Sequence, residues 1–194
     1  PGSFYGNFLS IVAGSEVEPR PVGNWNSESP PPAVGPGSPP EAVLGFWIAN
    51  ALEGASDPAA SVVAPDAPWV GLGDSPDVFV RGSAPYQAYD TSLSCTAADE
   101  TALCSATWND FWMNPNPDLT LGSMTVRAVV AEGMIVEFEE FSFSPEIGTA
   151  FDGHFQWLTT RYPDRLASQC PGDGASQECS ELLVETVEEW VATR

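Results

Sequence analysis

Residues 124–143, MTVRAVVAEGMIVEFEEFSF, constrain the fold more than any other stretch, because their pattern is that of a β-hairpin. Alternation in the first half predicts one apolar strand face, formed by Val126, Ala128 and Val130. Glu132 and Gly133 supply a tight turn, since glycine accepts a positive φ at little cost. The second half is rich in β-branched and aromatic side chains, as strands generally are. A chain that contains this hairpin is expected to have an antiparallel sheet at its centre.

The charge of the chain is strongly one-sided. Six Lys+Arg stand against 27 Asp+Glu, which gives a formal net charge of −21 at pH 7, and every cation is an arginine. Because there is no basic stripe to meet phosphates, the sequence argues against nucleic-acid binding and against an anionic membrane surface. No apolar run is long enough to span a bilayer, so membrane insertion is not expected. A solvated acidic surface is the simplest interpretation of the charge, and an extracellular or salty setting would suit it.

The four cysteines fall in two local pairs, Cys95 with Cys104 and Cys170 with Cys179. Each pair brackets a polar, turn-like segment, which favours local disulfides among the three possible connectivities. Free thiols and a zinc site are the alternatives. No CxxC spacing is present, and the single histidine, His154, is not close to either pair in sequence, so no metal site is expected. Disulfides predict a secreted or cell-surface protein.

The chain divides into an arm and one domain. Residues 1–37 form the arm, and the Pro/Gly/Ser-rich composition of residues 23–40 predicts a semi-rigid linker that cannot build a core. An ordered segment that wraps the surface, anchored by Trp25, is the alternative. Residues 38–194 form the expected domain. Its first helix starts at residues 38–41, SPPE, where serine is the expected N-cap and proline and glutamate occupy the first turn.

The other elements are predicted from periodicity and turn signals. In chain order they are a short helix over 59–63, an edge strand over 67–72, a short strand over 78–80, a hairpin of residues 86–96 and 103–111, the hairpin of 124–143, a helix over 151–162 and a last helix capped by Ser180. Helices followed by an antiparallel sheet and further helices indicate an α+β fold. The sequence has no GxSxG, HExxH or CxxC motif and no glycine-rich phosphate loop.

Two segments resemble a known group. Residues 38–71 contain Ala-Pro-Asp-Ala-Pro-Trp at 64–69, and together with the hairpin of residues 126–141 they resemble SnoaL-like domains. This broad group includes ketosteroid isomerase, limonene epoxide hydrolase and nuclear-transport-factor-2-like proteins. The matching residues mark a helix end and a strand start, and the catalytic constellations of the group do not align onto numbered positions of this chain.

The resemblance implies a curved, mostly antiparallel sheet wrapped around N-terminal helices as a cone-shaped barrel, here with an extra C-terminal helix. It also implies a deep apolar cavity for a small hydrophobic molecule. Enzymes of this kind would use acid–base chemistry without metal or cofactor, as isomerases, cyclases, dehydratases or epoxide hydrolases. A homodimer formed through the outer face of the sheet is a further expectation from the resemblance.

Four residues are candidates for catalysis. Arg127, in mid-strand, could pair with Glu137 or Glu139 across the hairpin and orient water or a carbonyl, although an exposed ion pair of little energetic value is the alternative. Asp110 stands among aromatic residues that could desolvate it, or it is a polar strand end. Tyr89 could donate to an oxyanion, or it is a packing residue.

Aromatic residues are the candidates for a pocket lining, since apolar ligand sites are usually built from them. These residues are Trp47, Trp69, Trp108, Trp112 and Phe138. Core packing is the alternative for each. Two functions therefore stay open: a cofactor-independent acid–base enzyme, and a secreted binding or accessory domain without catalysis. A carboxylate that meets an arginine or tyrosine in the pocket would favour the enzyme, and a purely apolar cavity would favour the binding domain.

Overall fold

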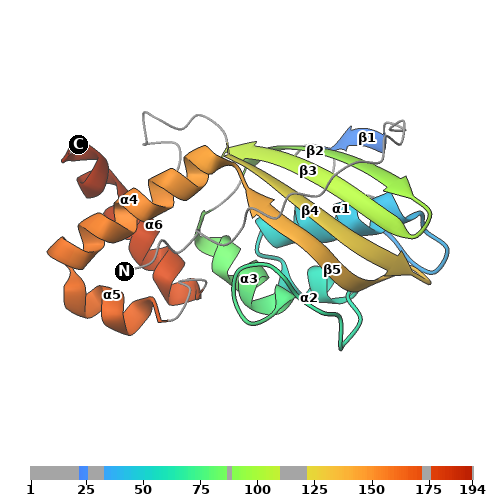
Figure 1. Ribbon diagram of the computed structural model, residues 1–194, viewed down its shortest axis with the longest axis horizontal. Coiled ribbons are helices and arrows are strands. Elements are labelled where there is room, and N and C mark those ends of the chain that lie inside the picture. Colours follow the sequence, from blue (N-terminus) through green and yellow to red (C-terminus); the bar gives the residue numbers. More distant parts are fainter. Residues whose placement is uncertain (1–21, 26–32, 87–88, 110–121, 172–175, 194) are drawn as a thin grey trace.

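The computed structural model describes residues 22–25, 33–86, 89–109, 122–171 and 176–193. It has an α+β architecture, as predicted, with a sheet, helices against one face of the sheet, and a second group of helices beyond one end of it (Figure 1). No helix among the described residues is long and apolar enough to cross a membrane.

The sheet is an antiparallel meander in the order β1-β2-β3-β4-β5. A short strand, β1 (Val22–Trp25), lies at one edge, followed by the four long strands β2 (Tyr89–Ala98), β3 (Thr101–Asn109), β4 (Gly122–Ala131) and β5 (Met134–Phe143). Among the described residues the sheet is not closed into a barrel, because β1 and β5 are its two edges and do not pair. That differs from the closed shape expected from the resemblance.

Both predicted hairpins are confirmed, and local backbone chemistry explains each turn. In the β4–β5 turn, Glu132 and Gly133 have φ values of 54° and 81°, the left-handed pair that suits a two-residue hairpin loop. In the β2–β3 turn, Asp99 has a φ of 52°, and the hairpin turns within two residues, so both strands run closer to the turn than predicted. At its other end β2 begins at Tyr89, since Tyr86 belongs to the 3-10 helix Ala84–Tyr86. A positive φ in a two-residue hairpin loop suits the right-handed twist of paired strands.

The two strands of the central hairpin differ in regularity. In β4 every second residue is buried, as alternation predicts, from Met124 to Val130. In β5 the register shifts twice, and the buried residues Ile135, Phe138 and Phe141 are three apart. Each bulge inserts one extra residue on the β5 side. Phe138 is therefore buried opposite Ala128, whereas Glu140 lies opposite Arg127.

Helix α1 (Pro40–Leu52) packs across the sheet and contacts β2, β3, β4 and β5. Its buried face carries Val43, Leu44, Trp47, Ile48 and Ala51, each fully shielded from solvent. The helix begins where predicted, but its N-cap residue is Pro39. The hydroxyl of Ser38 instead accepts the N–H of Gly35 at 3.0 Å and closes a turn before the helix.

Helices α2 (Ser56–Ala60) and α3 (Pro76–Ser83) pack against α1. The strand predicted over 78–80 is wrong, since these residues belong to α3. The hydroxyl of Ser75 accepts the N–H of Val78, and Pro76 occupies the first turn, so a capped helix start outweighs the short apolar run.

Residues 67–72, predicted as an edge strand, do not form a regular strand. The segment of residues 62–68 nevertheless covers the open edge of β5. The N–H of Ile135 donates to the carbonyl of Val62 at 2.7 Å, and the N–H of Phe138 donates to that of Pro68 at 3.0 Å. Proline has no N–H to extend a ladder but can still accept through its carbonyl. The covered edge is protected from pairing with another chain.

The C-terminal part contains three helices, α4 (Pro145–Arg161), α5 (Pro163–Gln169) and α6 (Gln177–Ala192), where two were predicted. Helix α4 starts at Pro145, earlier than predicted. The N-cap of α6 is Ser176, whose hydroxyl accepts the N–H of Cys179 at 3.1 Å, so Ser180 is not the cap. Helix α6 contacts α3, the short 3-10 helix η1 (Ala84–Tyr86), α4 and α5.

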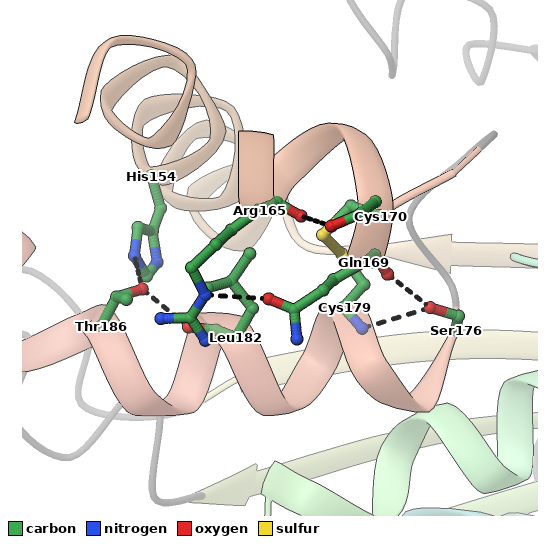
Figure 2. The surroundings of a disulfide bond; sticks show 9 residues. His154, Arg165, Gln169, Cys170, Ser176, Cys179, Leu182 and Thr186 are labelled. Carbon is green, nitrogen blue, oxygen red and sulfur yellow. Dashed lines mark hydrogen bonds between the residues drawn. A yellow bond between two sulfur atoms is a disulfide. The ribbon is translucent and has the colours of Figure 1, made fainter. Parts of the chain in front are cut away.

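Both predicted disulfides are confirmed. Cys95 and Cys104 are directly opposite in β2 and β3 and link the two strands of one hairpin. Cys170 and Cys179 join the end of α5 to the first turn of α6 (Figure 2). Beside the second bond, the Ser176 hydroxyl donates to the carbonyl of Gln169 at 2.9 Å, which closes the same junction (Figure 2).

Candidate functional site

A pocket of about 670 Å³ lies among α1, α2, the segment that covers the β5 edge, and the start of α3. Its apolar lining includes Trp47, Val63, Trp69 and Val80, and its polar lining includes Asp66, Asp74, Ser75 and Asp77. The pocket therefore combines an indole wall with carboxylates, all contributed by the first third of the described domain.

The indole of Trp69 is held in place by the loop that follows it. Its Nε1–H points to the carbonyls of Leu72 and Gly73, at 3.3 Å and 3.0 Å. Gly71 lies so close to the six-membered ring that a Cβ at this position would collide with it. The chain thus curls around a half-buried indole, and glycine at position 71 is required for that close approach.

Behind the pocket wall the aromatic residues form a continuous cluster. Trp47, Trp69, Phe79, Phe138 and Phe141 contact one another, with ring centroids between 4.8 and 6.1 Å apart. Trp47 is 0% exposed and Phe138 1% exposed, so both are core residues, and Trp47 also reaches the pocket wall. Offset and edge-to-face ring contacts of this kind stabilise a core beyond simple burial.

The carboxylates reach the pocket from two segments, the loop after α2 and the start of α3. Asp66 and Asp74 are exposed loop residues, whereas Asp77 lies in the first turn of α3, where a negative charge is favourable. Asp77 pairs with Arg81 one turn later, with 2.7 Å between Oδ2 and Nη2. Within the described part of the chain, no Arg or His side chain lines the pocket.

The candidate residues of the hairpin lie on the other side of the sheet. Arg127 alternates with the buried residues of β4 and therefore projects from the face opposite α1. Its Nη2 is 3.6 Å from Oε2 of Glu140, and both side chains are about one-third exposed, at 32% and 39%. The bulge in β5 makes Glu140 its partner in place of Glu137 or Glu139, and Glu137 is exposed opposite Val129. The structure does not bring Arg127 and Glu137 to the pocket.

The other candidates fall wholly or partly outside the described residues. Asp110 and Trp112 lie outside them altogether. Tyr89 and Trp108 belong to β2 and β3 through their backbones, but their side chains are not among those described. Sequence reasoning missed Asp74, Ser75 and Asp77. The Ser-Pro-Asp signature of a helix start was the signal that could have located them.

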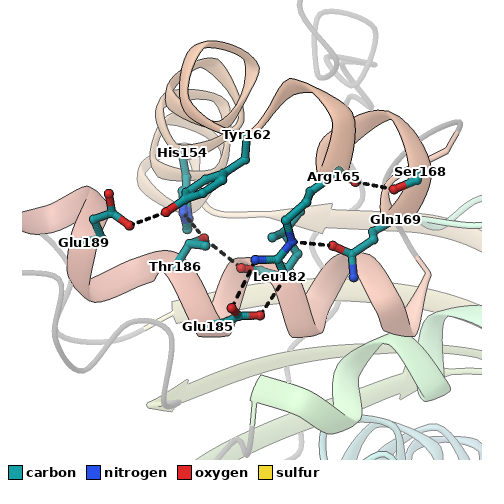
Figure 3. A network of polar contacts seen from close by, with 9 residues as sticks. All are labelled: His154, Tyr162, Arg165, Ser168, Gln169, Leu182, Glu185, Thr186 and Glu189. Carbon is teal, nitrogen blue, oxygen red and sulfur yellow. Dashed lines mark hydrogen bonds and ion pairs between the residues drawn. The ribbon is translucent and has the colours of Figure 1, made fainter.

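A second polar cluster lies within the C-terminal helices (Figure 3). His154 of α4 is 0% exposed, and its Nε2 is 3.0 Å from the hydroxyl oxygen of Thr186 in α6. That hydroxyl donates to the carbonyl of Leu182 at 2.7 Å, so its one proton is already used and it accepts the Nε2–H of the imidazole. Burial lowers the pKa of His154 to about 3, which keeps the ring neutral.

An exposed ion pair and a hydrogen bond to a carboxylate lie beside this buried contact and tie α5 and the residue before it to α6 (Figure 3). Arg165 donates through Nη1 and Nη2 to the two carboxylate oxygens of Glu185, at 3.1 and 2.7 Å. The hydroxyl of Tyr162 donates to Glu189 at 2.7 Å, a hydrogen bond that lowers the pKa of the carboxylate and raises that of the phenol. Nothing in this arrangement resembles a nucleophile or an open base, and we assign the cluster to stability.

Among the described residues, no group of three or more His, Cys, Asp or Glu side chains could hold a metal ion. No protein-family model matches the sequence, and searches of curated proteins and of solved structures returned no match. The pocket around Trp69 is therefore the candidate site on its geometry alone.

Proposed function

We propose that this protein is a secreted binding domain of SnoaL-like architecture, and that the pocket beside Trp69 holds a small molecule with an apolar body. The observation that carries the proposal is the half-buried indole, fixed by the loop carbonyls at the wall of a pocket of about 670 Å³. Sites for small molecules typically measure about 300–1,000 Å³ and combine apolar walls with a few placed polar groups.

The order of the elements supports the SnoaL-like part of the proposal. A long helix, a short helix, an extended edge segment and a third helix precede the four long strands β2–β5 of the antiparallel meander. Under this proposal the sheet is one wall of an open cone around α1. The two disulfides support secretion, since such bonds persist mainly in oxidising compartments.

Binding is favoured over catalysis by the chemistry of the lining. An isomerase, cyclase, dehydratase or epoxide hydrolase needs a base together with a group that polarises the substrate. The ionisable residues of the described lining are carboxylates alone, while Arg127 and Glu137 belong to the opposite face of the sheet. We therefore propose that the pocket retains its ligand without transforming it.

The test is a ligand screen with a matched pair of tryptophan variants. Fragment-sized aromatic and terpenoid compounds are screened against the wild-type protein by ligand-observed NMR, and hits are titrated against Trp69→Ala and Trp157→Ala. Trp157 lies in α4, outside the pocket lining, and is also a half-buried indole. Circular dichroism and thermal melting establish that each variant is folded.

We expect hits to bind Trp69→Ala at least ten times more weakly than wild type, because the contact surface of the indole is lost. The same hits should bind Trp157→Ala with unchanged affinity. Equal binding to wild type and a folded Trp69→Ala variant would contradict the proposal, as would a screen that yields no hit.

A further inference from the structure

We infer that the pocket selects organic cations, that is, molecules with an apolar body and a positively charged amine or quaternary ammonium group. This inference rests on the proposed function and adds the chemical class of the ligand. It follows from the charge, the pairing and the spacing of the groups around Trp69.

The charge of the lining has one sign. Asp66 comes from the loop after α2, whereas Asp74 and Asp77 both come from the start of α3. No described Arg or His side chain lines the pocket. The whole chain, with a formal net charge of −21, adds a field that attracts cations and repels anions. An anionic ligand would meet repulsion both at long range and in the pocket.

Two of these three carboxylates form no ion pair with the described part of the chain. Asp77 is paired with Arg81, but Asp66 and Asp74 form no ion pair there. The start of α3 would by itself favour an anion. Here the Ser75 hydroxyl already caps the helix and Asp77 already supplies the negative charge, so this preference is satisfied within the protein.

Spacing favours a bulky cation over a metal ion. Ca²⁺ requires about six to eight oxygen ligands converging on one point. Among the described residues, the carboxylates of the pocket do not form a group of three that could hold a metal ion. A substituted ammonium carries a diffuse charge, gains from carboxylates placed around it, and packs its methyl or methylene groups on an indole face. Trp69 provides that indole at the same pocket wall.

Three probes of similar size test the inference. They are benzyltrimethylammonium, its neutral carbon isostere neopentylbenzene, and the anion phenylacetate, each titrated by ligand-observed NMR at low and at raised salt. We expect the cation to bind at least ten times more tightly than the neutral isostere, with a preference that shrinks as salt is added.

Two double variants assign the preference to the pocket. Asp66→Asn with Asp74→Asn should bring the cation and the isostere to within about threefold of one another, while leaving the isostere unchanged. Glu139→Gln with Glu188→Gln makes the same change of net charge at exposed positions of β5 and α6, and it should leave the preference intact.

The outcomes separate this inference from the proposed function. If the isostere or phenylacetate binds as tightly as the cation, or if the aspartate double variant keeps the preference, the pocket stands and its cation selectivity is refuted. If the apolar screen yields hits at Trp69 but benzyltrimethylammonium does not bind, selectivity is again refuted. If neither the probes nor the screened compounds bind, the proposed function fails as well.

Discussion

The imidazole of His154 lies almost parallel to the indole of Trp190, with ring centroids 4.5 Å apart and planes 4° apart. His154 comes from α4 and Trp190 from α6, and both are buried. The contact lets two helices pack closely around a polar ring whose Nε2–H is satisfied by Thr186. The C-terminal helices are therefore assembled around a histidine that must stay neutral.

Acid should weaken the protein through His154. Its pKa is lowered from 6.5 to about 3 in the folded state, so the unfolded chain binds a proton first as the pH falls. The contribution of the neutral His154 to the free energy of unfolding is therefore fully present above pH 6.5 and is lost as the pH falls towards 3. Between pH 7 and pH 5 the loss should be about 2 kcal/mol, at about 1.4 kcal/mol per unit below the unfolded pKa. Urea unfolding at the two pH values measures it.

The control for this loss is His154→Gln, which keeps an N–H donor and does not titrate. Exposed carboxylates contribute equally to both proteins, so the difference between the two pH slopes isolates the histidine. A variant that loses as much stability as wild type between pH 7 and pH 5 would contradict the assignment.

Thr186→Val should destabilise the protein by about 1–3 kcal/mol, because the methyl group cannot accept the buried Nε2–H of His154. Thr186→Ser keeps the hydroxyl and removes only a methyl group, so it should cost about 1 kcal/mol. Chemical denaturation of both variants provides the comparison. If the two variants lost equal stability, the hydrogen bond to His154 would not be the cause of the loss in Thr186→Val. In wild type, ¹⁵N NMR should find the proton of the imidazole on Nε2.

The two disulfides should differ in their resistance to reductant. Cys95 and Cys104 are 2% and 0% exposed, whereas Cys170 is only partly buried. Under graded dithiothreitol, alkylation and peptide mass mapping should find Cys170 and Cys179 modified first. Replacing this pair by serine should cost about 2–3 kcal/mol, the loop-closure entropy of a bond with a sequence separation of 9. Earlier modification of the Cys95 pair would contradict the order.

Gly71→Ala should displace the Trp69 indole, since a Cβ at this position collides with the ring. We expect the free energy of unfolding to fall by about 1–3 kcal/mol. The affinity for a pocket ligand should fall as well, because the indole is displaced. Gly148→Ala is the control, because a Cβ there meets nothing within 4 Å and alanine favours the α4 helix by up to about 1 kcal/mol. Thermal melting and the indole N–H signals in ¹H–¹⁵N NMR follow both variants, and an unshifted Trp69 indole signal in Gly71→Ala would contradict the close approach.

Arg127→Gln should change the free energy of unfolding by less than about 1 kcal/mol, because its ion pair with Glu140 is partly exposed. It should also leave ligand binding unchanged, since the two residues lie on the face of the sheet opposite α1. Titration of any pocket ligand measures the second point. If Arg127→Gln bound a ligand ten times more weakly than wild type, the ligand site would have to be assigned to the face of the sheet opposite α1.

Much of the local structure could be predicted from the sequence. The β4–β5 hairpin follows from alternation in β4 and from Glu132-Gly133, which adopt the left-handed conformation a tight turn requires. The disulfides follow from the spacing of the cysteines. The start of α3 was also predictable from residues 75–77, although a short apolar run was read as a strand. These features depend on interactions between residues close in sequence.

The candidate site was less predictable. The partner of Arg127 depends on a bulge in β5, and a shift of one residue in register changes which side chains face each other. The pocket unites Trp69 with Asp74 and Asp77 through a loop that curls around an indole, an arrangement without a periodic signature.

By itself, the sequence determined the α+β class, the two hairpins, the two disulfides and the start of α1, because turn chemistry, strand alternation and helix capping act over a few residues. Only the tertiary structure decided that His154 is a neutral core residue, that Arg127 faces away from α1, and that the carboxylates gather around Trp69. Those outcomes depend on register and on packing between distant segments, where the free energy comes from burial shared by many residues.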